Sequence, residues 1–178
     1  EVGGAMVKTS DGNFAMANHY GLGTGFGSLF KVNNDLDTIW WKNYNVSFST
    51  VIVNCIETSD KGFLLTGWVF QTVEQNISDL LIIKTDSLGN YQWHKAYGDP
   101  ILAEHGSNTI ETPDGGYLIG GQRWYPPVYQ TNDAIVIKID SSGNEEWIKQ
   151  FGNPDVDDNK AMVEMADDGN YMVATVYG

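Results

Sequence analysis

The chain has 178 residues, of which 42% are hydrophobic and 19% are charged, a balance that suits a folded domain with a sizeable core. The net charge of −13 at pH 7 would repel a phosphate backbone, so we expect no nucleic-acid partner, and solubility is the simplest reason for the charge. The 20 glycines and the 12% of aromatic residues favour strands and turns over helices. No apolar stretch approaches the roughly 20 residues that span a bilayer, so no membrane span is expected. The single cysteine, Cys55, stands among β-branched residues and is expected to be buried and inert.

A sequence repeat with a period of about 50 residues runs through the chain. Its first block occurs four times, as TSDGNFAMA, TSDKGFLLT, TPDGGYLIG and ADDGNYMVA, and a second block follows the first three copies. The first block aligns an aspartate in every copy: Asp11, Asp60, Asp114 and Asp168. The second block aligns a lysine and a tryptophan: Lys31, Lys84 and Lys138, with Trp40, Trp93 and Trp147. Repeats of this length indicate one supersecondary unit per copy.

Each unit contains four short segments that are rich in β-branched or aromatic residues and bounded by Gly, Asn or Asp, which predicts four strands. Four-stranded meanders repeated at this period are typical of a β-propeller. We therefore predict an all-β fold, a single β-propeller domain or fragment built of four-stranded antiparallel blades. The chain supplies three full blades and half of a fourth, over residues 1–46, 47–98, 99–152 and 153–178. The remaining blades would come from a longer chain or from a second copy, and a compact four-bladed ring is a further alternative.

Two local features follow from the aligned residues. The turns within each blade carry residues that tolerate positive φ, such as Gly89, as tight hairpins require. In the first unit Leu36 replaces this glycine, so we expect a wider or bulged hairpin there. The recurrent tryptophan is expected to pack between neighbouring blades, where burial of such a ring contributes on the order of 4 to 6 kcal/mol at most.

The combined pattern T-x-D-G-G-Y-L-x-x-G … D-x-x-I-x-K-x-D-x-x-G-N-x-x-W-x-K-x-(Y/F)-G resembles the propeller-type repeats of large secreted or cell-surface bacterial proteins, many of which carry a type IX secretion sorting domain. The resemblance covers essentially the whole chain. It implies an extracellular or cell-surface location and a binding or scaffold role. The blades are also loosely similar to those of quinoprotein dehydrogenases, but the turn is one residue shorter and lacks their threonine, so no quinone cofactor is expected.

The segments that do not repeat are the longer connections between the second and third strands of a unit and between one unit and the next. Antiparallel order places both kinds of connection at one end of the blades, opposite the short turns. Variable loops on a rigid scaffold commonly carry function, so we expect a glycan or a protein to bind at this end. These loops cover residues 21–27, 70–78 and 124–132, and residues 45–50, 98–106 and 152–160.

The loop RWYPPVYQ is the strongest candidate for a ligand-binding site. It holds Arg123, Trp124, Tyr125 and Tyr129 beside two prolines that stiffen the backbone. Rigid, exposed aromatic rings can stack on sugars or anchor a protein partner at low entropic cost. The alternative is that these rings pack against neighbouring blades.

The only cluster that resembles an acid–base site consists of Asp99, Glu104 and His105. Together with Asp155 it supplies carboxylates for an alternative function, a propeller-fold glycosidase or lyase that acts on polysaccharide. Glycosidases need two carboxyl groups roughly 5 to 10 Å apart. We favour a non-enzymatic binding module, because no nucleophile-elbow or zinc-protease motif accompanies these residues.

The acidic loop DVDDN offers a candidate calcium site, because Asp155, Asp157 and Asn159 place oxygens at alternate positions. However, Lys160 stands where the EF-hand loop has glycine, and the twelfth position is Ala166 rather than glutamate. A solvated acidic loop is therefore favoured over calcium, and no other cofactor is predicted.

Overall fold

The computed structural model describes residues 4–21, 25–71, 77–125, 132–152 and 158–177, and for residues 158, 159, 176 and 177 it describes the backbone alone. These residues form fourteen strands and no helix. Antiparallel pairing joins the strands in chain order into three four-stranded sheets and one two-stranded sheet. The predicted all-β fold and its antiparallel four-stranded units are thereby confirmed.

The sheets are numbered here in chain order. Sheet 1 consists of β1 (Met6–Lys8), β2 (Phe14–Tyr20), β3 (Phe26–Val32) and β4 (Thr38–Tyr44). Sheet 2 consists of β5 (Ser49–Glu57), β6 (Phe63–Phe70), β7 (Ser78–Thr85) and β8 (Tyr91–Tyr97). Sheet 3 consists of β9 (Ala103–Glu111), β10 (Tyr117–Trp124), β11 (Asn132–Ile139) and β12 (Glu145–Phe151). Sheet 4 consists of β13 (Asp158–Met165) and β14 (Tyr171–Tyr177).

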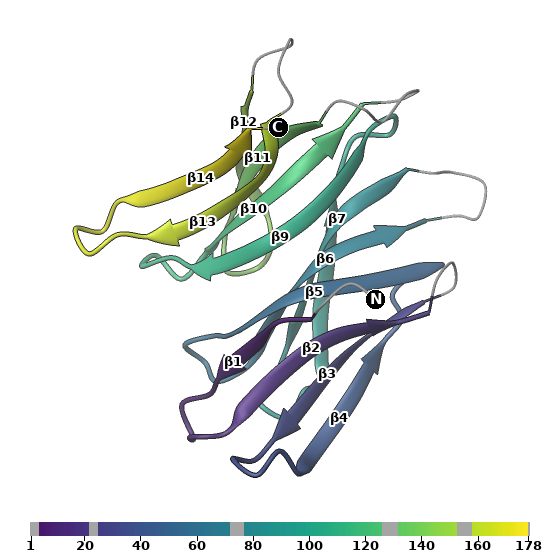
Figure 1. Ribbon diagram of the computed structural model, residues 1–178, viewed down its shortest axis with the longest axis vertical. Coiled ribbons are helices and arrows are strands. Elements are labelled where there is room, and N and C mark those ends of the chain that lie inside the picture. Colours follow the sequence, from purple (N-terminus) through teal and green to yellow (C-terminus); the bar gives the residue numbers. More distant parts are fainter. Residues whose placement is uncertain (1–3, 22–24, 72–76, 126–131, 153–157, 178) are drawn as a thin grey trace.

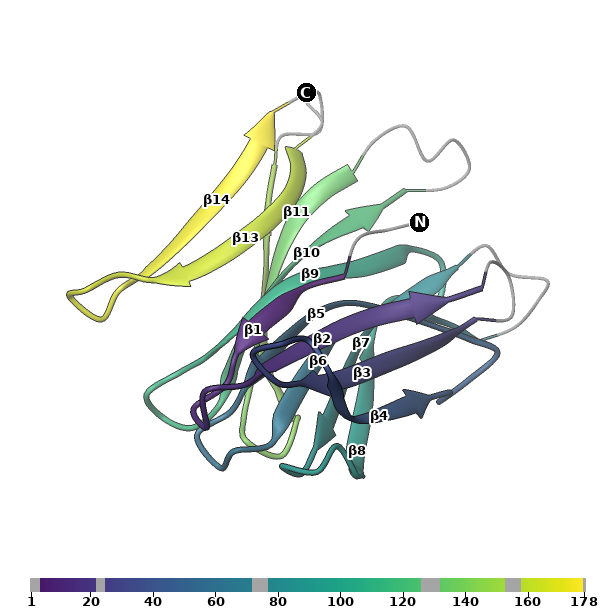
Figure 2. The same cartoon turned by 60° about the horizontal axis from the view of Figure 1, so that its bottom comes forward.

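Successive sheets pack face to face in chain order (Figures 1 and 2), and a separate hydrophobic cluster fills each interface. The cluster between sheets 1 and 2 includes Leu29, Phe63, Leu65 and Cys55. The cluster between sheets 2 and 3 includes Leu64, Ile82, Ile119 and Ile135. The cluster between sheets 3 and 4 includes Leu118, Val136, Ala161 and Val163. The middle strands of sheets 2 and 3 are hydrophobic on both faces because a neighbouring sheet covers each face.

The repeated tryptophan packs at these interfaces, as the sequence predicts. Trp40 lies against the cluster between sheets 1 and 2, and Trp93 lies against the cluster between sheets 2 and 3. Each ring also covers a turn glycine of the next sheet, since a Cβ on Gly89 would come 2.7 Å from the Trp40 ring and one on Gly143 would come 2.9 Å from the Trp93 ring. Glycine therefore serves both the positive φ of this turn and the close approach of the ring.

The hairpin between β3 and β4 shows that the prediction of a wider turn at Leu36 is wrong. The Leu36 N–H donates to the Asn33 carbonyl at 3.0 Å, the same bond that Gly89 makes to the Asp86 carbonyl at 3.1 Å. A bulge flanks this hairpin, but the same bulge flanks the matching hairpins of sheets 2 and 3. Leu36 reaches the turn geometry by adopting a φ of 65°, which costs an L-residue about 1–2 kcal/mol. The turn thus keeps its shape although this residue disfavours it.

In each of the first three sheets, a buried lysine on the third strand binds the aspartate of the first hairpin turn. In sheet 2, Lys84 is 4% exposed and donates from Nζ to Asp60 Oδ2 at 2.8 Å and to the Thr85 carbonyl at 2.9 Å. Burial opposes ionisation of Asp60, but hydrogen bonds from Lys84 and Thr58 outweigh it and lower the pKa to about 2. The same pair recurs at 3.0 Å in sheets 1 and 3, as Lys31 with Asp11 and Lys138 with Asp114.

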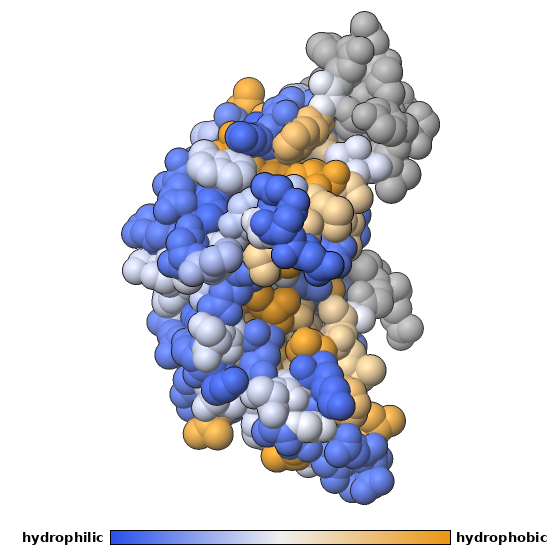
Figure 3. All heavy atoms as spheres, turned by 90° about the vertical axis from the view of Figure 1, so that its left-hand side faces the viewer, coloured by the Kyte–Doolittle hydropathy of each residue, from blue (hydrophilic) through white to orange (hydrophobic). Residues whose placement is uncertain are grey.

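The short turns of all sheets lie at one end of the molecule, on the left in Figure 1, and the variable connections lie at the other end. Seen from the side of the turns, the surface is largely hydrophilic, with hydrophobic residues in a narrower band (Figure 3). Over the described residues the four sheets form an open stack and do not close into a ring (Figure 1). The described part of the chain has no helix of the length and apolarity needed to cross a membrane.

Candidate functional site

Part of the variable-loop end lies outside the described residues. This is the case for Tyr129, Asp155 and Asp157, and of Asn159 only the backbone within β13 is described. The side chains of the candidate calcium site therefore lie outside the described residues. Among the residues that are described, no group of three or more His, Cys, Asp or Glu side chains is placed to hold a metal ion.

An ion pair between Glu104 and Arg123 lies at the loop end of sheet 3. The two residues face each other on β9 and β10, and Arg123 Nε donates to Glu104 Oε1 at 2.8 Å. The backbone N–H of Asp99 lies 3.4 Å from the other carboxylate oxygen. Glu104 is 1% exposed, so its carboxylate is not open to a substrate in this geometry. The structure thus joins a residue from the predicted acid–base cluster to one from the predicted ligand loop.

A polar network extends this ion pair towards the surface. Arg123 Nη1 donates to Gln150 Oε1 at 3.4 Å, and Gln150 Nε2 donates to the Tyr125 hydroxyl at 2.7 Å. The Tyr125 hydroxyl donates to Asp133 Oδ2 at 2.9 Å, and burial raises the pKa of Tyr125. Gln150 was not predicted as a site residue, because it lies within a repeated block. Its difference from Ala96, the aligned residue of sheet 2, is the signal that would have found it.

A second carboxylate, Asp79, lies beside Glu104. A Cβ built on Gly98 would come 2.2 Å from Asp79 Oδ1 and 3.0 Å from Glu104 Oε2, so both oxygens border the space that the glycine leaves. Burial raises the pKa of Glu104, with Asp79 adding to the effect and Arg123 opposing it. Asp79 is not among the carboxylates singled out in the sequence, and Arg123 binds the other member of this pair, Glu104.

His105 bridges sheets 2 and 3 rather than facing solvent as a general base would. Its ring stacks on Trp68 with centroids 4.2 Å apart, and its Nε2 lies 2.8 Å from the Ser78 hydroxyl. Burial lowers the pKa of His105 to about 4, so the ring is neutral near pH 7.

Trp124, the predicted aromatic anchor, ends β10 and is half-buried. Its indole Nε1 is buried and has no hydrogen-bond partner among the described residues. A buried indole N–H normally has a partner, so this atom distinguishes Trp124 from the repeated tryptophans.

A groove of about 280 Å³ lies at the same end of sheet 1, on the face turned away from sheet 2. Four aromatic rings line it, and two of them are strongly exposed: Tyr20 by 72% and Trp41 by 61%. Polar side chains lie between the rings, and the Ser28 hydroxyl donates to Asn43 Oδ1 at 2.9 Å. The full lining is Asn18, His19, Tyr20, Phe26, Ser28, Phe30, Trp41 and Asn43.

The composition of this groove departs from the repeat. Leu81, which aligns with Ser28, is buried in the interface that sheet 2 makes with the preceding sheet. Sheet 1 has Ser28 there, and it has Asn18 where sheet 2 has Gly67. His19 Nδ1 is buried and has no hydrogen-bond partner among the described residues. The groove was not predictable from the sequence, because its residues come from three strands and meet only when the sheet forms.

No protein-family model matches the chain. A comparison with curated proteins gives no match either. The loop end departs from the repeat in two places, the Glu104–Arg123 network of sheet 3 and the aromatic groove of sheet 1.

Proposed function

We propose that the protein is a secreted or cell-surface β-propeller module that binds a glycan at its variable-loop end, without catalysis. Its sheets share one strand order and pack face to face in sequence order, which supports their assignment as blades. The likeness of the repeat to those of bacterial surface proteins supports the location. Further blades would come from a longer chain or from a second copy.

The observation that carries this proposal is the aromatic groove of sheet 1. Exposed rings such as Tyr20 and Trp41 offer flat apolar surfaces for the C–H faces of sugars. Asn18 and Asn43 supply amide donors and acceptors for hydroxyl groups. The volume of about 280 Å³ lies at the lower end of the range for small-ligand sites, which suits one or two sugar rings. The net charge of −13 favours neutral over anionic glycans.

A glycan array followed by calorimetry tests the proposal. We expect neutral glycans to bind, and Trp41→Ala to weaken binding at least tenfold, because one stacking surface is lost. Tyr91→Ala is the matched control, since Tyr91 is a similarly exposed ring (53%) beside a short turn of sheet 2, and it should leave affinity unchanged. Equal affinity of the Trp41→Ala variant would reject the groove as the site.

Trp124→Ala separates the groove from the loop predicted in the sequence. If the glycan binds in the groove, this variant binds as the unmodified protein does. If it binds at Arg123, Trp124, Tyr125 and Tyr129 instead, Trp124→Ala loses affinity while Trp41→Ala keeps it. Binding of a protein but of no glycan would contradict the proposed ligand class.

A further inference from the structure

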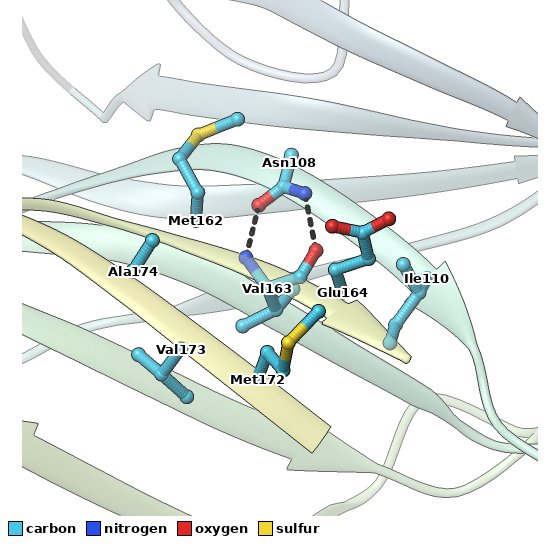
Figure 4. A pocket seen from close by; sticks show the side chains of 8 residues that line it. All are labelled: Asn108, Ile110, Met162, Val163, Glu164, Met172, Val173 and Ala174. Atoms are coloured by element: carbon cyan, nitrogen blue, oxygen red, sulfur yellow. Dashed lines mark hydrogen bonds between the residues drawn. The ribbon is translucent and has the colours of Figure 1, made fainter. Parts of the chain in front are cut away.

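An asparagine of sheet 3 binds the backbone of the neighbouring sheet 4. Figure 4 shows the Asn108 side chain facing the main chain of Val163 on β13. Asn108 Nδ2 donates to the Val163 carbonyl at 2.8 Å, and the Val163 N–H donates to Asn108 Oδ1 at 3.0 Å. We call these two bonds the amide clamp. Because both bonds go to main-chain atoms, the clamp does not depend on the side chain of residue 163.

The asparagine recurs in sheet 2, but the clamp does not. The segment NCIE of β5 aligns with NTIE of β9, so Asn54 aligns with Asn108. The same clamp would join Asn54 to the backbone of Thr109, which aligns with Val163. Instead, Asn54 Oδ1 is buried and has no hydrogen-bond partner among the described residues. A buried acceptor without a partner is destabilising, so some other residue of this interface prevents the clamp.

The two sheets differ in the residue that lies opposite the asparagine. Across β9 and β10, Asn108 pairs with Gly120. Across β5 and β6, Asn54 pairs with Thr66. A Cβ on Gly120 would come 2.5 Å from the Ala161 carbonyl oxygen and 3.0 Å from Asn108 Oδ1. Glycine is therefore required for the clamp, because a side chain here would obstruct both β13 and the amide.

Thr66 joins sheets 2 and 3 through its hydroxyl group instead. Thr66 is 0% exposed, and its Oγ1 lies 2.6 Å from Thr109 Oγ1. A buried hydroxyl group needs such a partner. At the aligned positions of sheets 3 and 4, Gly120 and Val163 carry no hydroxyl group. Each kind of contact thus has its matching residue on both sheets.

We infer that the residue opposite the asparagine determines which kind of neighbouring sheet each face accepts. The face with Gly120 binds main-chain atoms and fits a first strand with a small residue, such as Ala161, at its register shift. The face with Thr66 fits a first strand that carries a hydroxyl group at the position of Thr109. The inference goes beyond glycan binding, and it concerns contacts between described residues only.

The variant Thr66→Gly tests the inference, with amide hydrogen exchange followed by NMR. Without the Thr66 side chain we expect Asn54 to bind the backbone of Thr109. The Thr109 N–H should then exchange about tenfold more slowly than in the unmodified protein, because it gains Asn54 Oδ1 as an acceptor. Rates are expressed relative to the slowest amides of β7, which corrects for a change in overall stability. Adding Asn54→Ala should abolish the slower exchange.

The matched control is Thr66→Ala, which removes the hydroxyl group but keeps the Cβ. We expect no slower exchange of the Thr109 N–H in this variant. Equal slowing in Thr66→Ala and Thr66→Gly would show that the hydroxyl group alone holds Asn54 away, and would overturn the inference. No slowing in Thr66→Gly, or slowing that persists with Asn54→Ala, would overturn it as well.

A second variant, Gly120→Ala, tests the same rule in sheet 3 and does not depend on the folding of Thr66→Gly. Its Cβ should displace the amide of Asn108, so we expect the Val163 N–H to exchange about tenfold faster, as in Asn108→Ala. Full protection of Val163 in Gly120→Ala would contradict the inference. Glycan affinity should stay unchanged in all these variants, because the groove lies in sheet 1. The two proposals can therefore fail separately.

Discussion

The two ends of this protein differ in whether their residues repeat from sheet to sheet. At the turn end, the same lysine–aspartate pair recurs in three sheets with Nζ–Oδ2 distances of 2.8 to 3.0 Å. At the loop end, Glu104 and Arg123 form a buried pair in sheet 3 where the aligned residues of sheet 2 are Thr50 and Val69. The residues that repeat therefore build the sheets, and the loop end varies from sheet to sheet without loss of the fold.

The largest effect is expected at the loop-end ion pair. Arg123→Ala leaves the Glu104 carboxylate buried without its counter-charge, so we expect the free energy of unfolding to fall by about 3–5 kcal/mol. Urea denaturation at pH 7 measures the change. A loss below about 1 kcal/mol would show that water reaches Glu104 and that the pair is not structural.

The double variant Glu104→Thr with Arg123→Val tests whether the fold of sheet 3 requires the ion pair. It gives sheet 3 the residues that sheet 2 carries as Thr50 and Val69. Because a buried ion pair is commonly replaced without cost by residues that pack well, we expect stability within about 1 kcal/mol of the unmodified protein. A loss as large as that of Arg123→Ala would mean that the pair is required by the fold of sheet 3.

A smaller effect is expected at the turn end. Lys84→Met removes the charged hydrogen bonds to Asp60 and to the Thr85 carbonyl, and we expect a loss of about 2 kcal/mol in urea denaturation. Lys95→Met, at an exposed position on β8, is the control and should change stability by less than about 0.5 kcal/mol. Equal losses would contradict the structural role of the buried lysine.

Acid titration of the same variant tests the pair independently. The pKa of Asp60 is about 2 in the folded protein and about 3.9 in an unfolded chain. Its contribution to stability is therefore present above about pH 4 and lost as pH falls towards about 2. In Lys84→Met this part of the acid transition should become shallower.

The next effect is an increase in stability. Leu36→Gly relieves the positive φ of Leu36, but glycine also makes the unfolded chain more flexible, so we expect a net gain of about 1 kcal/mol or less. Thermal unfolding measures it. The opposite substitution at the aligned position of sheet 2, Gly89→Leu, should destabilise the protein, because the new Cβ would meet the Trp40 ring. No gain from Leu36→Gly would show that the turn in sheet 1 is not strained.

Much of the fold could be predicted from the sequence because the repeat encodes it locally. The turn residues and the aliphatic runs mark the strands, Trp93 lies in an interface as expected, and Cys55 is buried as expected. The prediction of a wider hairpin at Leu36 was wrong, because one residue that disfavours positive φ does not outweigh the hydrogen bonds of the whole turn. Ring closure was not predictable in the same way, because it depends on contacts beyond a single unit.

The candidate site was less predictable because cross-strand register decides which side chains meet. Pairing of β9 with β10 shifts by one residue between Gly120 and Gly121. Without this bulge Arg123 would face His105, and with it Arg123 faces Glu104. Sequence spacing alone does not reveal such a shift, so the two predicted sites looked separate.

The smallest effect at neutral pH is expected at His105, which lies in the interface between sheets 2 and 3. His105→Gln keeps a partner for the Ser78 hydroxyl and loses the stacking on Trp68, so we expect the free energy of unfolding to fall by about 0.5 kcal/mol at pH 7.

On acidification we expect the order of stability of the two proteins to reverse. The folded-state pKa of His105 is about 4, below the value of about 6.5 in an unfolded chain, so the unfolded state takes up the proton first. The unmodified protein should therefore lose stability between about pH 6.5 and pH 4, and His105→Gln should lose less over this window. Parallel pH profiles of the two proteins in urea denaturation would show instead that water reaches the ring and that His105 titrates as an exposed residue.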